Sequence, residues 1–333
     1  MKQHRRRYLM QPSNSSNSPN SAWSWLIKHN EFALALSLLM IILVFSLLSE
    51  HFFSVRNLTN VFGQASIILT LSLGVSLVFI SGEVDISVGS LVAAVAIPLI
   101  EVMNVTESMT LGIFGALACG LLIGVINGYL VVYLRINSLI VTLGTLFIIR
   151  GGVYLYTGKK AIADKVYLES FFQLGNGRFM DVLPYPALIA GTLVILLTFA
   201  LRHTRFGRKV YAIGGDAKVA RLAGYNVQKV KFTCFVLCAL ISTVGGILLA
   251  SRLGSAVHLA GLGYEFQAVA AAVLGGISLA GGIGSLVGVL LGVLILAFVS
   301  NGLGMLGAPT EWQLVVTGIV IIIAVTLDSM KKQ

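Results

Sequence analysis

The chain has 333 residues, of which 57% are hydrophobic and 11% are charged, and its mean hydropathy is +0.92. Soluble domains carry about a quarter of their residues as charged side chains, so this composition excludes an ordinary cytosolic enzyme and a disordered chain. A membrane-spanning helix uses about 20 residues, and the apolar content suffices for about nine or ten such helices. The sequence therefore predicts an all-α, polytopic membrane protein.

Residues 1–31 are predicted to form a disordered, basic cytoplasmic tail. The segment is rich in Ser and Asn and carries five basic residues, so it has too little apolar surface to bury. A cleaved signal peptide is not expected, because the first apolar run begins only at Phe32. That run reaches Ser49 without a charge and is long enough to act as a membrane anchor.

Ten apolar runs follow one another along the chain. They lie at residues 32–49, 61–80, 87–103, 111–134, 138–157, 184–201, 231–251, 266–280, 284–303 and 312–327. The run at 266–280 is short and flanked by glycines, which leaves open a tilted or re-entrant piece and a count one lower or one higher. We expect residues 32–330 to form one transmembrane domain of about ten helices.

The distribution of Lys and Arg predicts the orientation of these helices. With the N-terminus inside and the helices alternating, the inside segments hold 16 basic residues and the outside segments hold six. Cytoplasmic loops of membrane proteins are enriched in Lys and Arg, so both termini are predicted to be cytoplasmic. The net charge of +10 is thereby attributed to topology, and no nucleic-acid partner is expected.

Residues 202–231 form the most informative soluble segment, with eight basic residues and one acid. Gly214 and Gly215 are predicted to bend the chain, and Asp216 is predicted to cap a short helix at residues 217–223. Gly224 is placed to end that helix. A solvated loop whose charge only fixes the topology is one interpretation. The capped helix between two spans favours the other, a docking element that transmits a push from a partner.

Polar residues between and within the apolar runs are the second group of candidates. Glu83, Asp85 and Ser87 lie in the segment 81–90. At bilayer depth these carboxylates would mark a pathway. At the cytoplasmic surface Asp85 or Ser87 would cap the following helix, and we favour capping for Asp85.

Arg150 lies inside the predicted span 138–157. An arginine at that depth needs a partner or water. It could line a pathway, but we favour a structural ion pair with a carboxylate such as Glu83, Glu101 or Glu265.

Glycines at helical spacing predict close packing between helices. One ladder comprises Gly120, Gly124 and Gly128, and a second comprises Gly284, Gly288 and Gly292. Residues four apart share one helix face, and small residues there let another helix approach closely. The uncharged, glycine-rich stretch 274–285 is predicted to break the chain between two spans.

Motifs for catalysis, metal or nucleotide are missing from the sequence. Gly158, Lys159 and Lys160 do not fit a phosphate-binding loop, because the upstream glycine is misplaced and no Ser or Thr follows. Cys119, Cys234 and Cys238 all lie in apolar runs and are interpreted as packing residues. We expect no catalytic residues, no metal and no cofactor bound by this chain, so the predicted class is transport and not an enzyme.

Several motifs resemble one family when they are taken together in order. They are residues 82–90 (GEVDISVGS), 136–146 (INSLIVTLGTL), 204–208 (TRFGR), 212–215 (AIGG), 220–224 (ARLAG) and 270–285. Over about residues 33–330 the chain resembles the permease subunits of ATP-binding-cassette importers for ribose, arabinose, xylose and related sugars. Each motif alone is weak, and the set is specific.

The resemblance implies a permease fold, a bacterial inner-membrane location and import of a pentose or related sugar. It also implies a dimer with a second copy or a sister permease, a separate ATPase subunit that binds ATP and Mg, and a periplasmic sugar-binding protein. The family's coupling region falls on Gly214, Gly215, Asp216, Ala220, Arg221 and Gly224. In the family, position 216 is often Asn, which is also a good N-cap. The resemblance does not indicate which sugar is carried.

A second hypothesis comes from another class of transporter. An ion-coupled secondary transporter would use Glu83, Asp85 and Arg150 as a proton or sodium site. It would lose transport with the ion gradient and would need no partner protein.

Overall fold

The computed structural model describes residues 30–309, 311–316, 318–319, 322 and 326. Within them, eight helices are long and apolar enough to cross a membrane. They are α2 (Asn30–Leu48), α3 (Val55–Ile80), α4 (Val88–Thr106), α5 (Met109–Gly128) with its π-helical extension η1 (Tyr129–Tyr133), α6 (Ser138–Thr157), α8 (Tyr185–His203), α11 (Val227–Leu253) and α13 (Leu286–Met305). The all-α, polytopic fold is confirmed.

Shorter elements connect the long helices. They are the helices α7 (Glu169–Asn176), α9 (Arg205–Gly215), α10 (Ala217–Leu222) and α12 (Tyr264–Leu274), and the strands β1 (Ile162–Ala163), β2 (Arg178–Phe179), β3 (Leu183–Pro184) and β4 (Ser255–Ala256). The strands form two antiparallel pairs, β1 with β4 and β2 with β3. In the first pair Ile162 lies opposite Ala256, which joins the segment after α6 to the segment after α11.

The described residues do not confirm the predicted count of ten spans. The run at 266–280 contains α12, whose 11 residues extend only about 16 Å, far less than the roughly 30 Å of a bilayer core. The run at 312–327 and most of the predicted tail, residues 1–29, lie wholly or partly outside the described residues. Helix α2 already begins at Asn30, two residues before the predicted anchor.

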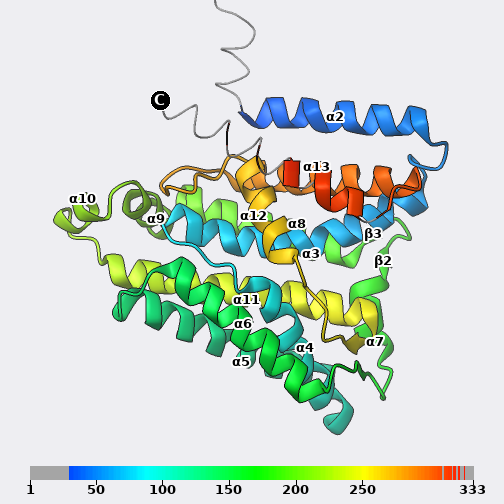
Figure 1. Ribbon diagram of the computed structural model, residues 1–333, viewed down its shortest axis with the longest axis horizontal. Coiled ribbons are helices and arrows are strands. Elements are labelled where there is room, and N and C mark those ends of the chain that lie inside the picture. The colour runs from blue at the N-terminus through cyan, green and yellow to red at the C-terminus, as the bar shows by residue number, and fades with distance from the viewer. Residues whose placement is uncertain (1–29, 310, 317, 320–321, 323–325, 327–333) are drawn as a thin grey trace, which may run out of the picture.

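Helix α3 lies at the centre of the bundle, packed between α11, α12, α13 and α8 (Figure 1). In an apolar 18-residue stretch of α3, 89% of the residues are buried, whereas in the corresponding stretch of α2 only 11% are buried. Helix α3 can be buried because its many Ser and Thr hydroxyls donate hydrogen bonds to carbonyls of their own helix. The Ser76 hydroxyl, for example, donates to the Ser72 carbonyl over 2.6 Å. Helix α2 lies at the edge, against α13.

The glycine ladder of α5 lies against α11. A Cβ at Gly124 would come within 2.7 Å of the Ala239 Cβ, and one at Gly120 or Gly128 would meet Thr243 or Phe232. In the second ladder Gly288 and Gly292 face the backbone of α12 and the residue after it. Gly284 precedes α13 and is not part of that helix face, because the helix begins only at Leu286.

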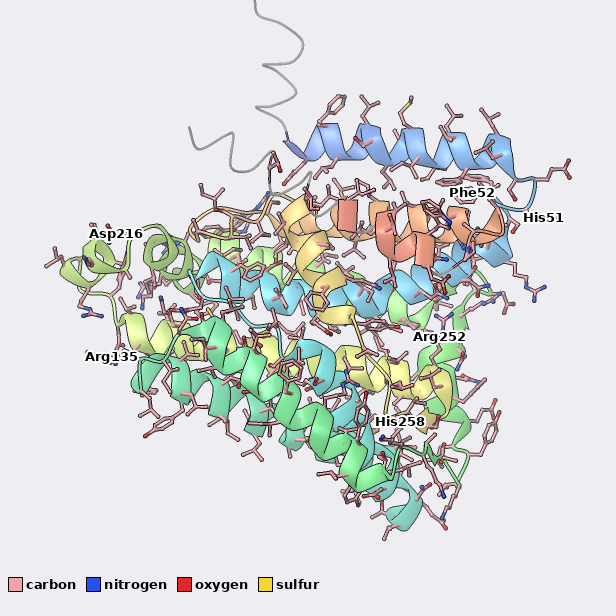
Figure 2. The ribbon with its side chains drawn as sticks, viewed as in Figure 1. His51, Phe52, Arg135, Asp216, Arg252 and His258 are labelled. Atoms are coloured by element: carbon pink, nitrogen blue, oxygen red, sulfur yellow. The ribbon has the colours of Figure 1, made fainter. Side chains whose placement is uncertain are left out.

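The two ends of the bundle carry different elements. Helices α9 and α10 and Arg135 lie at one end, while α7, the β2–β3 hairpin, His51 and Arg252 lie at the other (Figures 1 and 2). The basic segment 202–231 and the short helix therefore share one face of the molecule. All the long helices run between these two ends.

Candidate functional site

The segment 202–231 contains two helices and not the single one predicted. Thr204 caps α9, since its Oγ1 accepts a hydrogen bond from the Gly207 amide over 3.4 Å. Gly214 and Gly215, which were predicted to bend the chain, form the last turn of α9, and the bend follows at Asp216. The prediction was wrong because glycine disfavours a helix interior but is tolerated in its last turn.

Helix α10 is closed at both ends. The Asp216 carboxylate accepts from the amides of Lys218 and Val219 over 2.7 and 3.0 Å, as an N-cap does. At the other end Gly224 adopts a φ of +84°, and the Tyr225 amide donates to the Ala220 carbonyl over 3.1 Å, a Schellman motif. The predicted cap, helix and stop are therefore all present.

The two amides that bind the Asp216 carboxylate lower its pKa below the ordinary value. Hydrogen bonds to the ionised form favour that form. The cap is therefore charged and complete at neutral pH.

The outer face of α10 is both apolar and basic. Leu222 is 88% exposed and Val219 is 61% exposed, and Lys218 and Arg221 lie exposed beside them. The helix projects beyond the ends of the long helices (Figure 1). Such a surface is suited to contact with another protein. The sequence analysis missed Val219 and Leu222, although their spacing within a capped helix is visible in the sequence.

Backbone contacts between glycines join α9 to two distant segments. The Gly282 amide donates to the Ile80 carbonyl, at the end of α3, over 2.9 Å. A Cβ at Gly214 would overlap that carbonyl and would lie 2.5 Å from the Gly282 nitrogen, and one at Gly281 would lie 2.8 Å from the Gly82 Cα. We call these residues (80–82, 214 and 281–282) the glycine junction.

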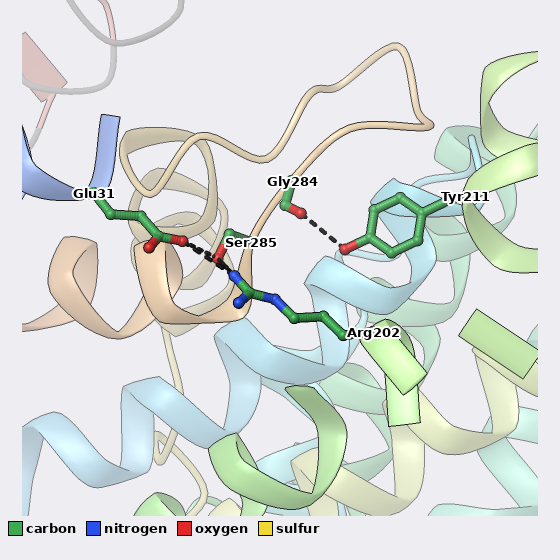
Figure 3. A network of polar contacts seen from close by, with 5 residues as sticks. All are labelled: Glu31, Arg202, Tyr211, Gly284 and Ser285. Carbon is green, nitrogen blue, oxygen red and sulfur yellow. Dashed lines mark hydrogen bonds and ion pairs between the residues drawn. The ribbon is translucent and has the colours of Figure 1, made fainter. Parts of the chain in front are cut away.

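Side chains fasten the same region further (Figure 3). The Tyr211 hydroxyl of α9 donates to the Gly284 carbonyl over 2.8 Å. Next to it, Ser285 donates to Glu31 at the start of α2, and Arg202 at the end of α8 lies 3.4 Å from the Glu31 carboxylate. The stretch 281–285 thus contacts α2, α8 and α9 together.

Residues 85–90 are buried beside this region. The Asp85 carboxylate is 1% exposed and accepts from the Ser87 amide and hydroxyl over 2.9 and 2.7 Å. Asn127 at the end of α5 donates to Ser87, and Thr145 of α6 donates to Asn127. Asp85 therefore orders the turn before α4, where Ser87 occupies the cap position without a side-chain cap bond. This differs from the capping of α4 by Asp85 that we favoured.

Arg150 binds backbone carbonyls. Its guanidinium donates to His258 and Ala260 over 3.0 and 2.9 Å, and to Gly89 over 3.1 Å. The first two lie in the irregular segment that leads into α12. Non-helical backbone inside a membrane protein needs such internal partners, and Arg150 supplies them.

The favoured ion pair of Arg150 is not found among the described residues. The three suggested carboxylates have other partners, namely Lys231 for Glu83, Tyr156 for Glu101 and the Gly263 amide for Glu265. The prediction failed because a sequence does not show which backbone carbonyls lack a partner within a helix or strand. Such carbonyls compete with carboxylates for a guanidinium. Glu83, Asp85 and Arg150 thus have three separate sets of partners and share no single site.

A family model described as "Branched-chain amino acid transport system / permease component" matches residues 57–325. The chain belongs to this permease family. The match covers every long helix of the permease except α2.

Individual relatives match over nearly the whole permease. The ribose import permease protein RbsC of Escherichia coli is 37% identical over 312 residues, which cover 93% of this chain and 96% of that protein. The L-arabinose ABC transporter permease protein AraH of Azospirillum brasilense is 33% identical, with 97% and 96% covered. RbsC of Bacillus subtilis is 37% identical, with 89% and 92% covered. No solved structure matches the chain significantly.

The described part of the permease contains no group of three or more His, Cys, Asp or Glu side chains arranged to hold a metal. Cys234 and Cys238 are fully buried in α11, and Cys119 is partly buried in α5. What the geometry does offer is an exposed capped helix connected through backbone contacts to the central helix.

Proposed function

We propose that the chain is the membrane-spanning subunit of an ATP-driven importer for a monosaccharide, a pentose or a related sugar. The names of its relatives support this proposal, since ribose and arabinose permeases match almost end to end. The structural observation that carries it is α10, a capped helix that exposes Leu222 and Val219 at the basic end of the bundle. A permease without an ATPase of its own needs such a docking surface.

The partners follow from this assignment. An ATPase subunit binds ATP and Mg and docks on the exposed face of α10. The coupling region comprises Gly214, Gly215, Asp216, Val219, Ala220, Arg221, Leu222 and Gly224, of which Ala220 anchors the buried face of α10. A periplasmic binding protein delivers the sugar to the opposite end, and a second copy or a sister permease completes a dimer. The excess of Lys and Arg at the α10 end supports our proposal that this end and both termini are cytoplasmic in a bacterial inner-membrane protein. The proposed domains are the tail 1–31 and a transmembrane domain at 32–330.

The mechanism is alternating access driven from the cytoplasmic side. Closure of the ATPase pair around ATP moves α10, and hydrolysis resets it. Because α10 follows α9 without an intervening loop, the movement reaches Gly214 and hence the end of α3 and residues 281–285. A ligand shifts such an equilibrium only by its differential affinity, so nucleotide and binding protein supply the driving free energy.

The ion-coupled alternative finds less support in the geometry. A proton or sodium site requires its carboxylates to converge, whereas Glu83 lies 2.6 Å from Lys231 and Asp85 is satisfied by Ser87. Arg150 is occupied by carbonyls. We therefore assign all three residues, with Ser87, to the structure around the glycine junction and α12.

Affinity purification in gentle detergent tests the docking assignment. Wild type is compared with Leu222→Glu, and Met180→Glu serves as the control, because Met180 is also highly exposed, at 80%, but lies next to β2 at the opposite end. We expect a P-loop ATPase to accompany wild type and Met180→Glu, and to be lost from Leu222→Glu. A wild-type chain that purifies without any ATPase would overturn the proposal.

A further inference from the structure

A cavity of about 630 Å³ lies between α3, α11, α12 and α13. Pockets for small molecules have volumes of about 300–1,000 Å³. Gln64 lies near the start of α3, Arg252 near the end of α11 and Asn301 near the end of α13. The cavity therefore lies toward the end of the bundle opposite α10, where Arg252 is placed in Figure 2.

The lining joins apolar and polar surface. The apolar part includes Ile67, Ile68, Leu249, Val293 and Leu296. The polar part includes Gln64, Arg252, Tyr264, Gln267, Ser300 and Asn301. These polar side chains come from four helices and line one space.

Several of these polar groups, which are exposed at Gln64 and half-buried at Arg252 and Gln267, make no hydrogen bond or ion pair with a described residue. This holds for the amides of Gln64 and Gln267 and for the guanidinium of Arg252, whereas Asn301 pairs with Asn57 over 2.9 Å. The Arg252 guanidinium lies against α3 at Gly63, where a Cβ would come within 3.0 Å of it. A glycine at 63 thus leaves room for the arginine at the cavity wall.

A sugar that crosses the bilayer core must exchange its water for other hydrogen-bonding partners. A hydroxyl moved into apolar surroundings without a partner costs several kcal/mol. The amide of Gln both donates and accepts, so it fits a hydroxyl of either polarity. The neighbouring apolar surface fits the C–H faces of the ring.

The charge of the lining separates two classes of solute. Its described residues include no Asp or Glu, and its one charged side chain is Arg252. A zwitterionic amino acid would leave its ammonium group without an anionic partner here, at a considerable desolvation cost. A neutral polyhydroxyl compound meets no such penalty.

We propose that this cavity is a monosaccharide-binding chamber on the transport path, in which Gln64, Gln267 and Arg252 bind the hydroxyls of the sugar. The inference rests on the proposed importer function and names the substrate-contacting residues of this subunit. The chamber receives sugar from the α7 end and lies on the side of the central helix α3 that α12 covers.

The test uses the complete importer in liposomes, with its ATPase and binding protein, and labelled ribose as the probe. The variants Gln64→Leu and Gln267→Leu keep side-chain size and remove the hydrogen bonds, and Gln64→Asn and Gln267→Asn keep the amide. Gln173→Leu is the control, because Gln173 lies on α7 outside the cavity lining and its side-chain amide donates to Glu169. Sugar uptake and ATP hydrolysis stimulated by the loaded binding protein are measured together.

Each Leu variant is expected to lower ribose uptake about fivefold, the effect of one lost hydrogen bond, while stimulated hydrolysis stays near the wild-type rate. The Asn variants should recover most of the uptake, and Gln173→Leu should match wild type. Unchanged uptake in both Leu variants, or an equal fall in uptake and hydrolysis, would overturn the chamber. Uptake of leucine by the wild type in place of ribose would overturn the substrate class. Failure of the importer proposal is distinct, because wild type would then show no ATP-driven uptake of either probe.

Discussion

The ammonium of Lys231 lies 2.6 Å from the carboxylate of Glu83, and the two side chains are 16% and 20% exposed. Lys231 is in the second turn of α11, a few residues after α10, and Glu83 lies in the segment between α3 and α4. The pair therefore joins the start of α11, the helix that follows α10, to the segment next to the glycine junction. Its partial burial makes it stronger than an exposed pair, which is worth little.

Removing either partner should destabilise the permease measurably. We expect Glu83→Gln and Lys231→Met each to lower the free energy of unfolding by about 1.5–3 kcal/mol, as for a hydrogen bond to a charged group. Thermal unfolding in detergent measures the loss. A double variant that loses as much as the two single variants added together would show that the residues do not interact.

Gly214 and Gly215 form a matched pair of neighbours. A Cβ at Gly214 would overlap the Ile80 carbonyl, whereas one at Gly215 meets nothing within 4 Å. Gly214→Ala should cost about 1–3 kcal/mol by overpacking and should weaken the stimulation of hydrolysis by the binding protein. Gly215→Ala should leave the free energy of unfolding unchanged, because its Cβ meets no packed atom. If both variants behave like wild type in unfolding and hydrolysis assays, the junction does not transmit motion.

Arg150 should tolerate neither loss of charge nor loss of its planar shape. Arg150→Met leaves three carbonyls without their donor, and we expect a cost of at least about 3 kcal/mol. Arg150→Lys restores the charge but cannot reach three carbonyls with one ammonium, so it should recover little stability. Thermal unfolding in detergent measures this cost, and uptake in liposomes with and without a sodium gradient separates the hypotheses. The ion-coupled hypothesis predicts that Arg150→Met has normal stability and an altered dependence of uptake on the gradient.

Helix α10 should be sensitive to acid through Asp216. The pKa of this carboxylate is lower in the folded chain than its ordinary value of about 3.9. The cap therefore stabilises α10 fully above that ordinary value and loses its effect as the pH falls through the folded pKa. Hydrogen exchange of the Lys218 and Val219 amides should show this transition in wild type and not in Asp216→Asn. The same transition in both proteins would assign it to another group.

Local signals in the sequence predicted the cytoplasmic element better than its surroundings. Asp216 and Gly224 act within three residues of themselves, so capping rules found both ends of α10. The long helices were found from their length and hydropathy. The run 266–280 was different, because α12 has only 11 residues and the rest of the run is irregular backbone. The partners of Arg150 and Gly214 could not be found in this way, because they lie far away in the sequence and are backbone atoms.

The cavity was also out of reach of sequence analysis. Gln64 on α3 is far in sequence from Arg252 and Gln267, which lie on the successive helices α11 and α12. Each is an ordinary polar residue that no motif singles out. Only the packing of α3, α11 and α12 brings them together. By contrast, the sequence alone shows that Val219 and Leu222 are apolar residues in a basic, capped helix. If that helix docks a partner, as predicted, these side chains are expected to be exposed.

ATP-driven uptake of ribose tests the central claim most directly. The permease, its ATPase and its binding protein are placed in liposomes with ATP inside, and uptake is followed with and without a proton or sodium gradient. The account predicts uptake that requires ATP and the binding protein, is insensitive to both gradients, and is lost in Leu222→Glu but not in Met180→Glu. Uptake that follows an ion gradient in the absence of ATP would contradict it.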